Sequence, residues 1–221
     1  MIERIDIKNM QKTDPMDTPL KRKRLYGPDV HLVSKEGVRL VEKTYRNRSW
    51  PVKAAGSLLV WWEAYIYSKL KDIPGIPEVV KSPDSFTLTT SFMGGHNLRD
   101  RSNKPDDAYF RSLEELLGKV HARGVVHLDM RNRRNYGMDD DGMPYLVDFA
   151  SSVYIPFKGP VWKLLCGIDQ MGYLKVKSKL NPALMSSEEK KQNNLGKTLS
   201  CLWFPSKVLP FFRTLFQRVF R

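Results

Sequence analysis

Residues 125–152 of the 221-residue chain read VVHLDMRNRRNYGMDDDGMPYLVDFASS, and this stretch is the most informative part of the sequence. It begins as a dense polar loop. Two short apolar pieces, 136–138 and 145–147, then lie on either side of the turn sequence DDDG at 139–142. Apolar pieces separated by such a turn are typical of a small β-hairpin. The hairpin places Asp148 at the end of its second strand.

Three polar side chains of this stretch fit the chemistry of phosphoryl transfer. That reaction needs a carboxylate that orients the attacking hydroxyl, oxygen ligands for magnesium, and cations on the phosphates. Asp129 would be the carboxylate, and Asn135 and Asp148 would be hard oxygen ligands for Mg²⁺.

The order of His127-x-Asp129, Asn135 and the Asp-Phe pair at 148–149 resembles the protein-kinase-like superfamily. There the catalytic loop reads H-x-D followed by Asn, and the metal motif is D-F-G. The resemblance implies that ATP and Mg²⁺ are the cofactors and that a hydroxyl receives the γ-phosphate. It assigns catalysis to Asp129, and it places Arg131 where many kinases keep a lysine on the transferred phosphate.

The family also needs a strand lysine that pairs with a glutamate on the next helix. Lys43 lies late in the second strand of a hairpin expected over 30–33 and 38–45. Glu63 lies in a helix expected over 54–70, where apolar residues recur at intervals of three and four. The resemblance implies that Lys43 contacts the nucleotide phosphates and that Glu63 holds its ammonium group in place.

The segment TTSFMGG at 89–95 falls where the family binds adenine, at the hinge between its lobes. The resemblance therefore makes Ser91, Phe92 and Met93 candidate adenine contacts.

The order of elements predicts an α+β, two-lobed protein-kinase-like fold with a small β-rich N-lobe and an abbreviated helical C-lobe. A strand at 86–92 follows the first helix, and a second helix is expected at 106–123. We expect four regions: a basic, loosely structured N-terminal arm at 1–28, an N-lobe at 29–93, a C-lobe at 94–198 and a basic amphipathic helix at 199–221.

Two details depart from the family pattern around the metal site. The family normally places its catalytic Asp and metal-binding Asn five residues apart, whereas Asp129 and Asn135 are six apart. One extra loop residue explains the difference, and Asn132 is the alternative ligand. The third letter of the D-F-G motif is Ala150, which restricts the backbone φ compared with glycine.

A glycine-rich phosphate loop is also missing. Only Gly27 precedes the first clear strand, and no G-x-G-x-x-G sequence occurs. The basic residues at 22–24 either compensate by charge or belong to a disordered tail. These departures motivate a rival hypothesis, in which the chain is a catalytically weak pseudokinase or a binding scaffold at the membrane surface.

Only 71 residues follow position 150, which is short for the usual helical lobe. In this short C-terminal part the chain resembles the abbreviated bacterial and RIO-type kinases and the lipopolysaccharide-core (Kdo/heptose) kinases. The acceptor is accordingly a protein Ser/Thr hydroxyl or a lipopolysaccharide-core sugar. A helix-like stretch carries Lys175, Lys177 and Lys179, which either meet an anionic acceptor or form a solvated face.

The net charge of +13 is distributed unevenly. Residues 1–150 hold 25 bases and 21 acids, hence +4, while residues 151–221 hold 12 bases and 3 acids, hence +9. Such asymmetry favours an anionic partner for the C-terminal part. The stretch 199–221 has 13 apolar residues, four bases and no acid, which is compatible equally with an anionic membrane surface and with intramolecular packing. Nucleic acid is disfavoured as a partner, because many peripheral membrane proteins share this composition.

Cysteine and histidine usage excludes two other classes of protein. Cys166 and Cys201 with four scattered histidines make neither a disulfide framework nor a zinc site. The N-terminus lacks the apolar core of a secretory signal, and no stretch is apolar enough to span a membrane. We therefore expect a cytoplasmic protein. If the C-terminal helix binds the membrane surface, we expect the protein to be peripheral on the inner face of the cytoplasmic membrane.

Overall fold

The computed structural model describes residues 18–19, 26–98 and 104–202. The chain divides into two units. The N-terminal unit runs to Asp72 and resumes at Ile76–Gly94, and the C-terminal unit comprises Ile73–Gly75 and the chain from Gly95 onward.

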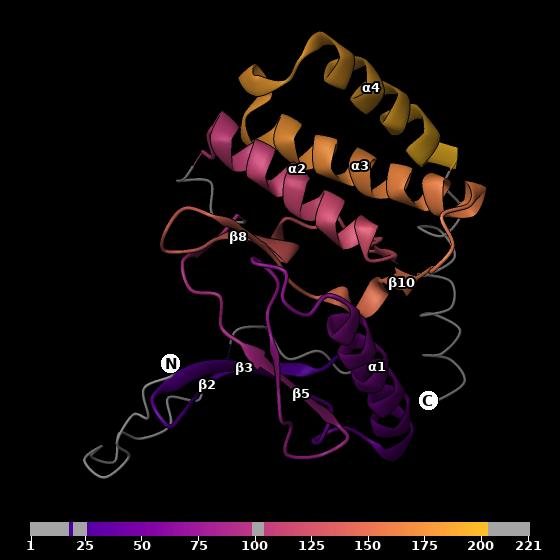
Figure 1. Cartoon of the computed structure of the whole chain (residues 1–221). Coiled ribbons are helices and arrows are strands. Elements are labelled where there is room, and N and C mark those ends of the chain that lie inside the picture. The colour runs from indigo at the N-terminus through magenta and orange to yellow at the C-terminus, as the bar shows by residue number, and fades with distance from the viewer. Residues whose placement is uncertain (1–17, 20–25, 99–103, 203–221) are drawn as a thin grey trace. The chain divides into compact units, whose positions relative to one another are not determined.

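An antiparallel sheet forms the body of the N-terminal unit (Figure 1). Its strand order is β1-β2-β3-β5-β4. The strands are β1 (Thr18–Pro19), β2 (Asp29–Lys35), β3 (Val38–Thr44), β5 (Thr87–Ser91) and β4 (Val79–Val80). Glu36 and Gly37 join β2 to β3 with φ of 52° and 78°. Two consecutive positive φ angles give a two-residue turn that matches the twist of the strands, so the expected hairpin forms here.

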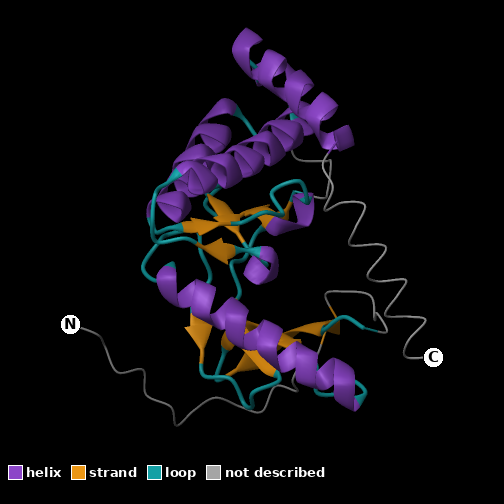
Figure 2. Cartoon of the chain, turned by 90° about the vertical axis from the view of Figure 1, so that its right-hand side faces the viewer, coloured by secondary structure: helices purple, strands orange, loops and turns teal. Residues whose placement is uncertain are grey.

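Helix α1 (Trp50–Lys69) lies beside this sheet (Figure 2). It starts four residues before the expected boundary, because a proline is tolerated in the first turn of a helix and Pro51 stands there. Gly56 packs against the ring of Tyr45, and a Cβ at position 56 would lie 2.3 Å from Tyr45 Cγ. This close approach holds the helix against the end of β3.

Two small sheets and a helix form the base of the C-terminal unit. The sheets pair β6 (His96–Asn97) with β8 (Tyr136–Met138) and β9 (Pro144–Leu146), and β7 (Val125–Val126) with β10 (Val153–Tyr154). Helix α2 (Asp107–Ala122) is capped by Asp106, whose carboxylate accepts from Tyr109 N at 2.8 Å. The stretch 125–126, expected as loop, is therefore a short strand, because it pairs with 153–154, which lie 27 and 29 residues later in the chain.

The remaining helices are α3 (Pro160–Leu180) and α4 (Ser187–Leu202) (Figure 1). They follow the short 3₁₀ turns Arg133–Asn135 and Phe149–Ser151, and Pro182–Leu184 lies between them. Helix α4 was not expected over 187–198, although its start is a capping box. Ser186 Oγ accepts from Glu189 N at 3.1 Å, and Ser186 N donates to Glu189 Oε2 at 2.7 Å.

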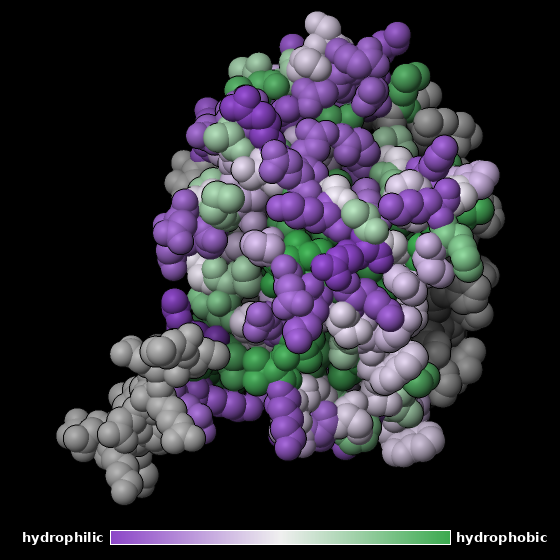
Figure 3. Space-filling view, in the orientation of Figure 1, coloured by the Kyte–Doolittle hydropathy of each residue, from purple (hydrophilic) through white to green (hydrophobic). Residues whose placement is uncertain are grey.

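The C-terminal unit has a core shared by its helices and β8–β9. Its fully buried side chains include Phe110, Leu113, Tyr136, Leu146 and Tyr173. The opposite face of α2 is polar, and Figure 3 shows hydrophilic side chains over this region. Helix α2 is thus amphipathic, with its apolar face in the core and its polar face in solvent.

Parts of two expected regions lie outside the described residues. In the N-terminal arm, 18–19 form β1, whereas 1–17 and 20–25 are not described. In the expected helix 199–221, the first four residues belong to α4, and 203–221 are not described. Among the described helices, none is long and apolar enough to cross a membrane.

Candidate active site

In the N-terminal unit, the structure brings Lys43 and Glu63 together. Lys43 lies on central strand β3, opposite Val30 on one side and Leu88 on the other. Its Nζ is 2.6 Å from Glu63 Oε2. The Glu63 side chain is only 3% exposed, and the Lys43 side chain is 14% exposed. Because a buried carboxylate is costly unless it is paired, this ion pair holds the ammonium group in one place on the sheet.

The candidate adenine residues follow one another at the end of β5 and beyond it. Ser91 Oγ accepts from Glu78 N at 2.9 Å, and Phe92 N donates to Arg39 O at 3.2 Å. The guanidinium of Arg39 also lies over the Phe92 ring, 4.8 Å from its centroid. Ser91, Phe92 and Met93 are all half-buried. The hydrogen bonds of Ser91 and Phe92 therefore fix the backbone of this segment at the end of β5.

In the C-terminal unit, the Asp129 loop (127–135) is tied to a buried acid, Asp169 on α3. The two carboxylate oxygens of Asp169 accept from His127 N and from Leu128 N, both at 2.7 Å. Oδ2 is also 3.0 Å from Nε2 of His121 on α2. Asp169 has no solvent exposure, and one side chain thus joins two helices to the start of the loop.

The carboxylate of Asp129 is held by two amides of the same loop. Asn135 Nδ2 donates to Asp129 Oδ2 at 2.9 Å and to the Asp129 carbonyl at 3.1 Å. Asn132 Nδ2 donates to Asp129 Oδ2 at 3.2 Å. Asn135 is 1% exposed, whereas Asn132 is half-buried. Both amide nitrogens donate to the carboxylate. The Asn132 side-chain oxygen accepts from Arg134 N at 3.3 Å, so the Asn135 side-chain oxygen is the better placed of the two to bind a cation.

The hairpin β8–β9 brings Asp148 next to this loop. Tyr136 pairs with Leu146, and Val147 N donates to the carbonyl of Asn135 at 3.0 Å. Asp148 is the next residue, so the two predicted metal ligands lie at one end of the hairpin.

Two residues of the site adopt left-handed backbone conformations. Asp148 has φ 67° and ψ 65°, and Leu128 has φ 61°. Each such conformation costs a non-glycine residue about 1–3 kcal/mol and persists only where the surrounding structure holds it. The other two described non-glycine residues with positive φ are Glu36 and Asp72. The strain adjoins both candidate acids, Asp129 and Asp148.

Aromatic packing fixes the base of the site. Phe149 is fully buried, and its ring centroid is 4.6 Å from that of His127. The hydroxyl of Tyr136 donates to the carbonyl of Met130. Burial, and then the charge of Asp169, raises the pKa of Tyr136 well above its ordinary value. The phenol therefore stays a hydrogen-bond donor at every working pH.

The donor set suits magnesium better than zinc. The described residues contain no group of three or more His, Cys, Asp or Glu side chains that could hold a metal ion. Mg²⁺ commonly takes one or two protein oxygen ligands and completes its shell with phosphate oxygens and water. Asn135 and Asp148 fit that pattern.

The fold has a clear counterpart among solved structures, although no family model and no curated protein matches the sequence. A Rio2 kinase from Chaetomium thermophilum, solved as an ADP/Mg²⁺-phosphoaspartate complex, superposes with a TM-score of 0.61. The match covers 80% of this chain and 62% of the Rio2 chain, at 17% sequence identity. The chain has a protein-kinase-like fold. The Rio2 likeness therefore confirms the predicted α+β class and its two-lobed kinase-like character.

Two residues that anchor the start of the Asp129 loop were not predicted from the sequence. These residues are Asp169 and His121. A signal existed for Asp169, because it is an acid on an otherwise apolar turn of LLCGIDQMGYL. Its partners are 41 and 42 residues earlier in the chain, so no local pattern could name them.

Proposed function

We propose that the chain is an ATP- and Mg²⁺-dependent phosphotransferase that transfers the γ-phosphate to a hydroxyl group. One observation carries the proposal: the Asp129 carboxylate is held by Asn132 and Asn135 in a loop anchored to buried Asp169. A preorganised carboxylate of this kind can orient an attacking hydroxyl and accept its proton. The kinase-like fold, and the ADP and Mg²⁺ in the Rio2 complex, support it.

In this proposal, different residues of the chain position the reacting groups and neutralise the charge of the phosphates. Asn135 and Asp148 would hold Mg²⁺ through oxygen atoms, with Asn132 as the alternative ligand. When bound, the metal neutralises charge on the phosphates. Arg131 would supply a bidentate positive group to the transferred phosphate. No covalent enzyme intermediate is required, because orientation and electrostatics account for such a transfer.

The N-terminal unit supplies the nucleotide contacts in this proposal. Lys43 would bind the α and β phosphates, oriented by Glu63 at 2.6 Å. Ser91, Phe92 and Met93 would contact adenine.

The acceptor is a protein Ser/Thr hydroxyl or a sugar hydroxyl of a lipopolysaccharide core, as the resemblance implies. Both make the same demand on Asp129. An assay with labelled ATP that offers protein substrates and lipopolysaccharide side by side separates them.

The central test compares two substitutions. Asp129→Ala is expected to keep ATP binding and lose transfer, whereas Asp148→Ala is expected to lose metal-dependent binding. Transfer to a hydroxyl at the wild-type rate by Asp129→Ala would refute the assignment. A labelled phosphoryl group retained on the enzyme and released by hydroxylamine would instead show an acyl phosphate and refute the direct route.

The rival hypothesis of a weak pseudokinase or scaffold rests on the missing glycine-rich loop and on Ala150 in place of the motif glycine. Wild-type protein that binds ATP with Mg²⁺ but transfers no phosphate to either acceptor would favour it.

A further inference from the structure

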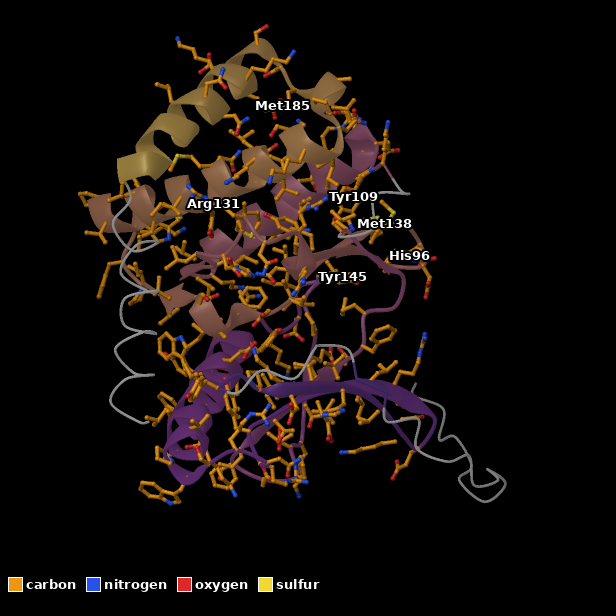
Figure 4. The ribbon with its side chains drawn as sticks, turned by 180° about the vertical axis from the view of Figure 1, so that it is seen from behind. His96, Tyr109, Arg131, Met138, Tyr145 and Met185 are labelled. Atoms are coloured by element: carbon orange, nitrogen blue, oxygen red, sulfur yellow. The ribbon has the colours of Figure 1, made fainter. Side chains whose placement is uncertain are left out.

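Helix α3 lies directly against the Asp129 loop. At Gly172 a Cβ would be 2.7 Å from Met130 Cβ and 3.1 Å from Arg131 N, so only a glycine permits this contact. Figure 4 shows Arg131 beside the helix. The face of α3 that carries Gly172 is therefore the face next to the proposed catalytic residue Asp129.

Two lysines share that face with Gly172. Lys175 and Lys179 follow it by three and seven residues, which places all three on one side of a helix. Lys175 is half-buried and Lys179 is exposed. Burial lowers the pKa of Lys175, and the nearby charges of Arg131 and Lys179 lower it further. The charges of Arg131 and Lys179 thus both act on Lys175, and these three residues are hereafter called the basic cluster.

The basic cluster is not neutralised by the described part of the chain. Among the described residues, no carboxylate forms an ion pair with any of its three members. Lys177 behaves differently, since it is buried and its Nζ is 2.7 Å from Glu189 Oε1. Lys177 therefore leaves the set of lysines expected to meet an anion, and two of the three remain.

Like charges held together favour an anionic ligand. A phosphomonoester carries about −1.5 to −2 charges at neutral pH and three acceptor oxygens, more than a single carboxylate offers. A guanidinium fork and ammonium groups are the side chains that bind such a group best.

We propose that Lys175 and Lys179 of the basic cluster recognise a phosphomonoester already present on the acceptor, beside the transferred phosphate that Arg131 contacts and next to the hydroxyl that Asp129 orients. This inference rests on the proposed function and narrows its substrate class to acceptors that are already phosphorylated. A sugar phosphate and a phosphopeptide share this chemistry.

The test measures binding by isothermal titration calorimetry with full-length protein. One pair of probes is glucose 6-phosphate and glucose, and the other is a serine peptide with and without a neighbouring phosphoserine. Wild type is expected to bind the phosphorylated member of at least one pair about tenfold more tightly. The pair that shows the preference identifies sugar or protein as the source. Equal binding within both pairs would overturn the proposal.

Substitutions locate the preference on α3. Lys175→Ala and Lys179→Glu are expected to reduce it severalfold, and Lys163→Ala, an exposed lysine on the same helix, is expected to retain it. Since Lys179 is exposed, its variant keeps the test valid if Lys175→Ala fails to fold. An equal loss in all three variants would assign the preference to general charge and refute the proposal. Phosphate-selective binding without any transfer would refute the proposed function alone, and transfer without selectivity would refute the basic cluster alone.

Discussion

Asp169 is a fully buried acid whose two oxygens receive three donors. It touches no proposed substrate atom, and it acts by holding the backbone of His127 and Leu128, two and one residues before Asp129. It is therefore a positioning residue. The left-handed backbone of Leu128 persists because these bonds over-determine it.

Asp169→Asn is predicted to reduce kcat while leaving the KM for ATP nearly unchanged. The amide would turn an N–H group toward at least one N–H donor, which costs about 1–3 kcal/mol of stability. Displacing the loop slightly would slow transfer by roughly 10²-fold. Steady-state kinetics and urea unfolding measure both effects. Asp107→Asn, at an exposed helix ion pair, is the control. A proportional rise of KM with kcat unchanged would contradict the positioning role.

At the scale of elements, α3 is the helix that organises the C-terminal unit. Its first half carries Asp169, and its middle turn contacts the Asp129 loop through Gly172. Its second half carries Lys177, which pairs with α4. One helix thereby links the loop, α2 and α4.

Gly172→Ala is predicted to destabilise the protein by about 1–3 kcal/mol and to impair transfer. The added methyl would lie 2.9 Å from the backbone carbon of Met130, so the loop must move. Gly167→Ala is the matched control on the same helix, because nothing lies within 4 Å of its Cβ. The control should gain about 0.5–1 kcal/mol from helix propensity. Urea unfolding compares the two variants, and equal stability would contradict the close approach at Gly172.

The ion pair between Lys177 on α3 and Glu189 on α4 is predicted to contribute a stability that depends on pH. Burial by itself would raise the pKa of Glu189, but hydrogen bonds from Lys177 and from Ser186 N bring it below its ordinary value of 4.5. The stability that this ion pair contributes is fully present above pH 4.5, and it is lost as the pH falls through the lowered pKa of Glu189 in the folded protein. Urea unfolding at stepwise lower pH should show Glu189→Gln less stable than wild type at neutral pH, with the gap closing in acid. Glu188→Gln, an exposed neighbour, should show no such gap.

At the scale of the whole molecule, the proposed function requires residues from both units. Lys43 and Glu63 belong to the N-terminal unit, and Asp129, Asn135 and Asp148 belong to the C-terminal unit. Binding of a ligand to the folded chain stabilises it by mass action.

ATP with Mg²⁺ is predicted to raise the melting temperature of the full chain. At a ligand concentration of 100 Kd, the gain in stability is about 2.7 kcal/mol. ATP with a chelator should give a much smaller shift, and so should ATP with Mg²⁺ added to Asp148→Ala. Differential scanning fluorimetry measures the shifts, with Asp141→Ala, an exposed turn acid, as control. An equal shift with and without Mg²⁺ would count against the metal ligands.

The local features of this protein can be predicted from the amino-acid sequence. The turn at Glu36-Gly37, the hairpin around the DDDG turn and most of α1 and α2 follow from φ preferences, caps and apolar spacing, which act within a few residues. The capping box at Ser186 is a local signal of the same kind. The order of Lys43, Glu63, Asp129, Asn135 and Asp148 was sufficient to predict a kinase-like fold.

Contacts between residues far apart in the chain could not be predicted in this way and are seen only in the folded protein. Asp169 bonds to the Asp129 loop, and α3 approaches that loop at Gly172. Lys177 is buried against Glu189, whereas the charge of Arg131 acts on Lys175. The residues in these contacts are separated by 12 to more than 40 positions in the chain. No periodicity encodes these contacts. They arise because buried charges must find partners and close packing must exclude voids, and both conditions depend on the whole folded unit.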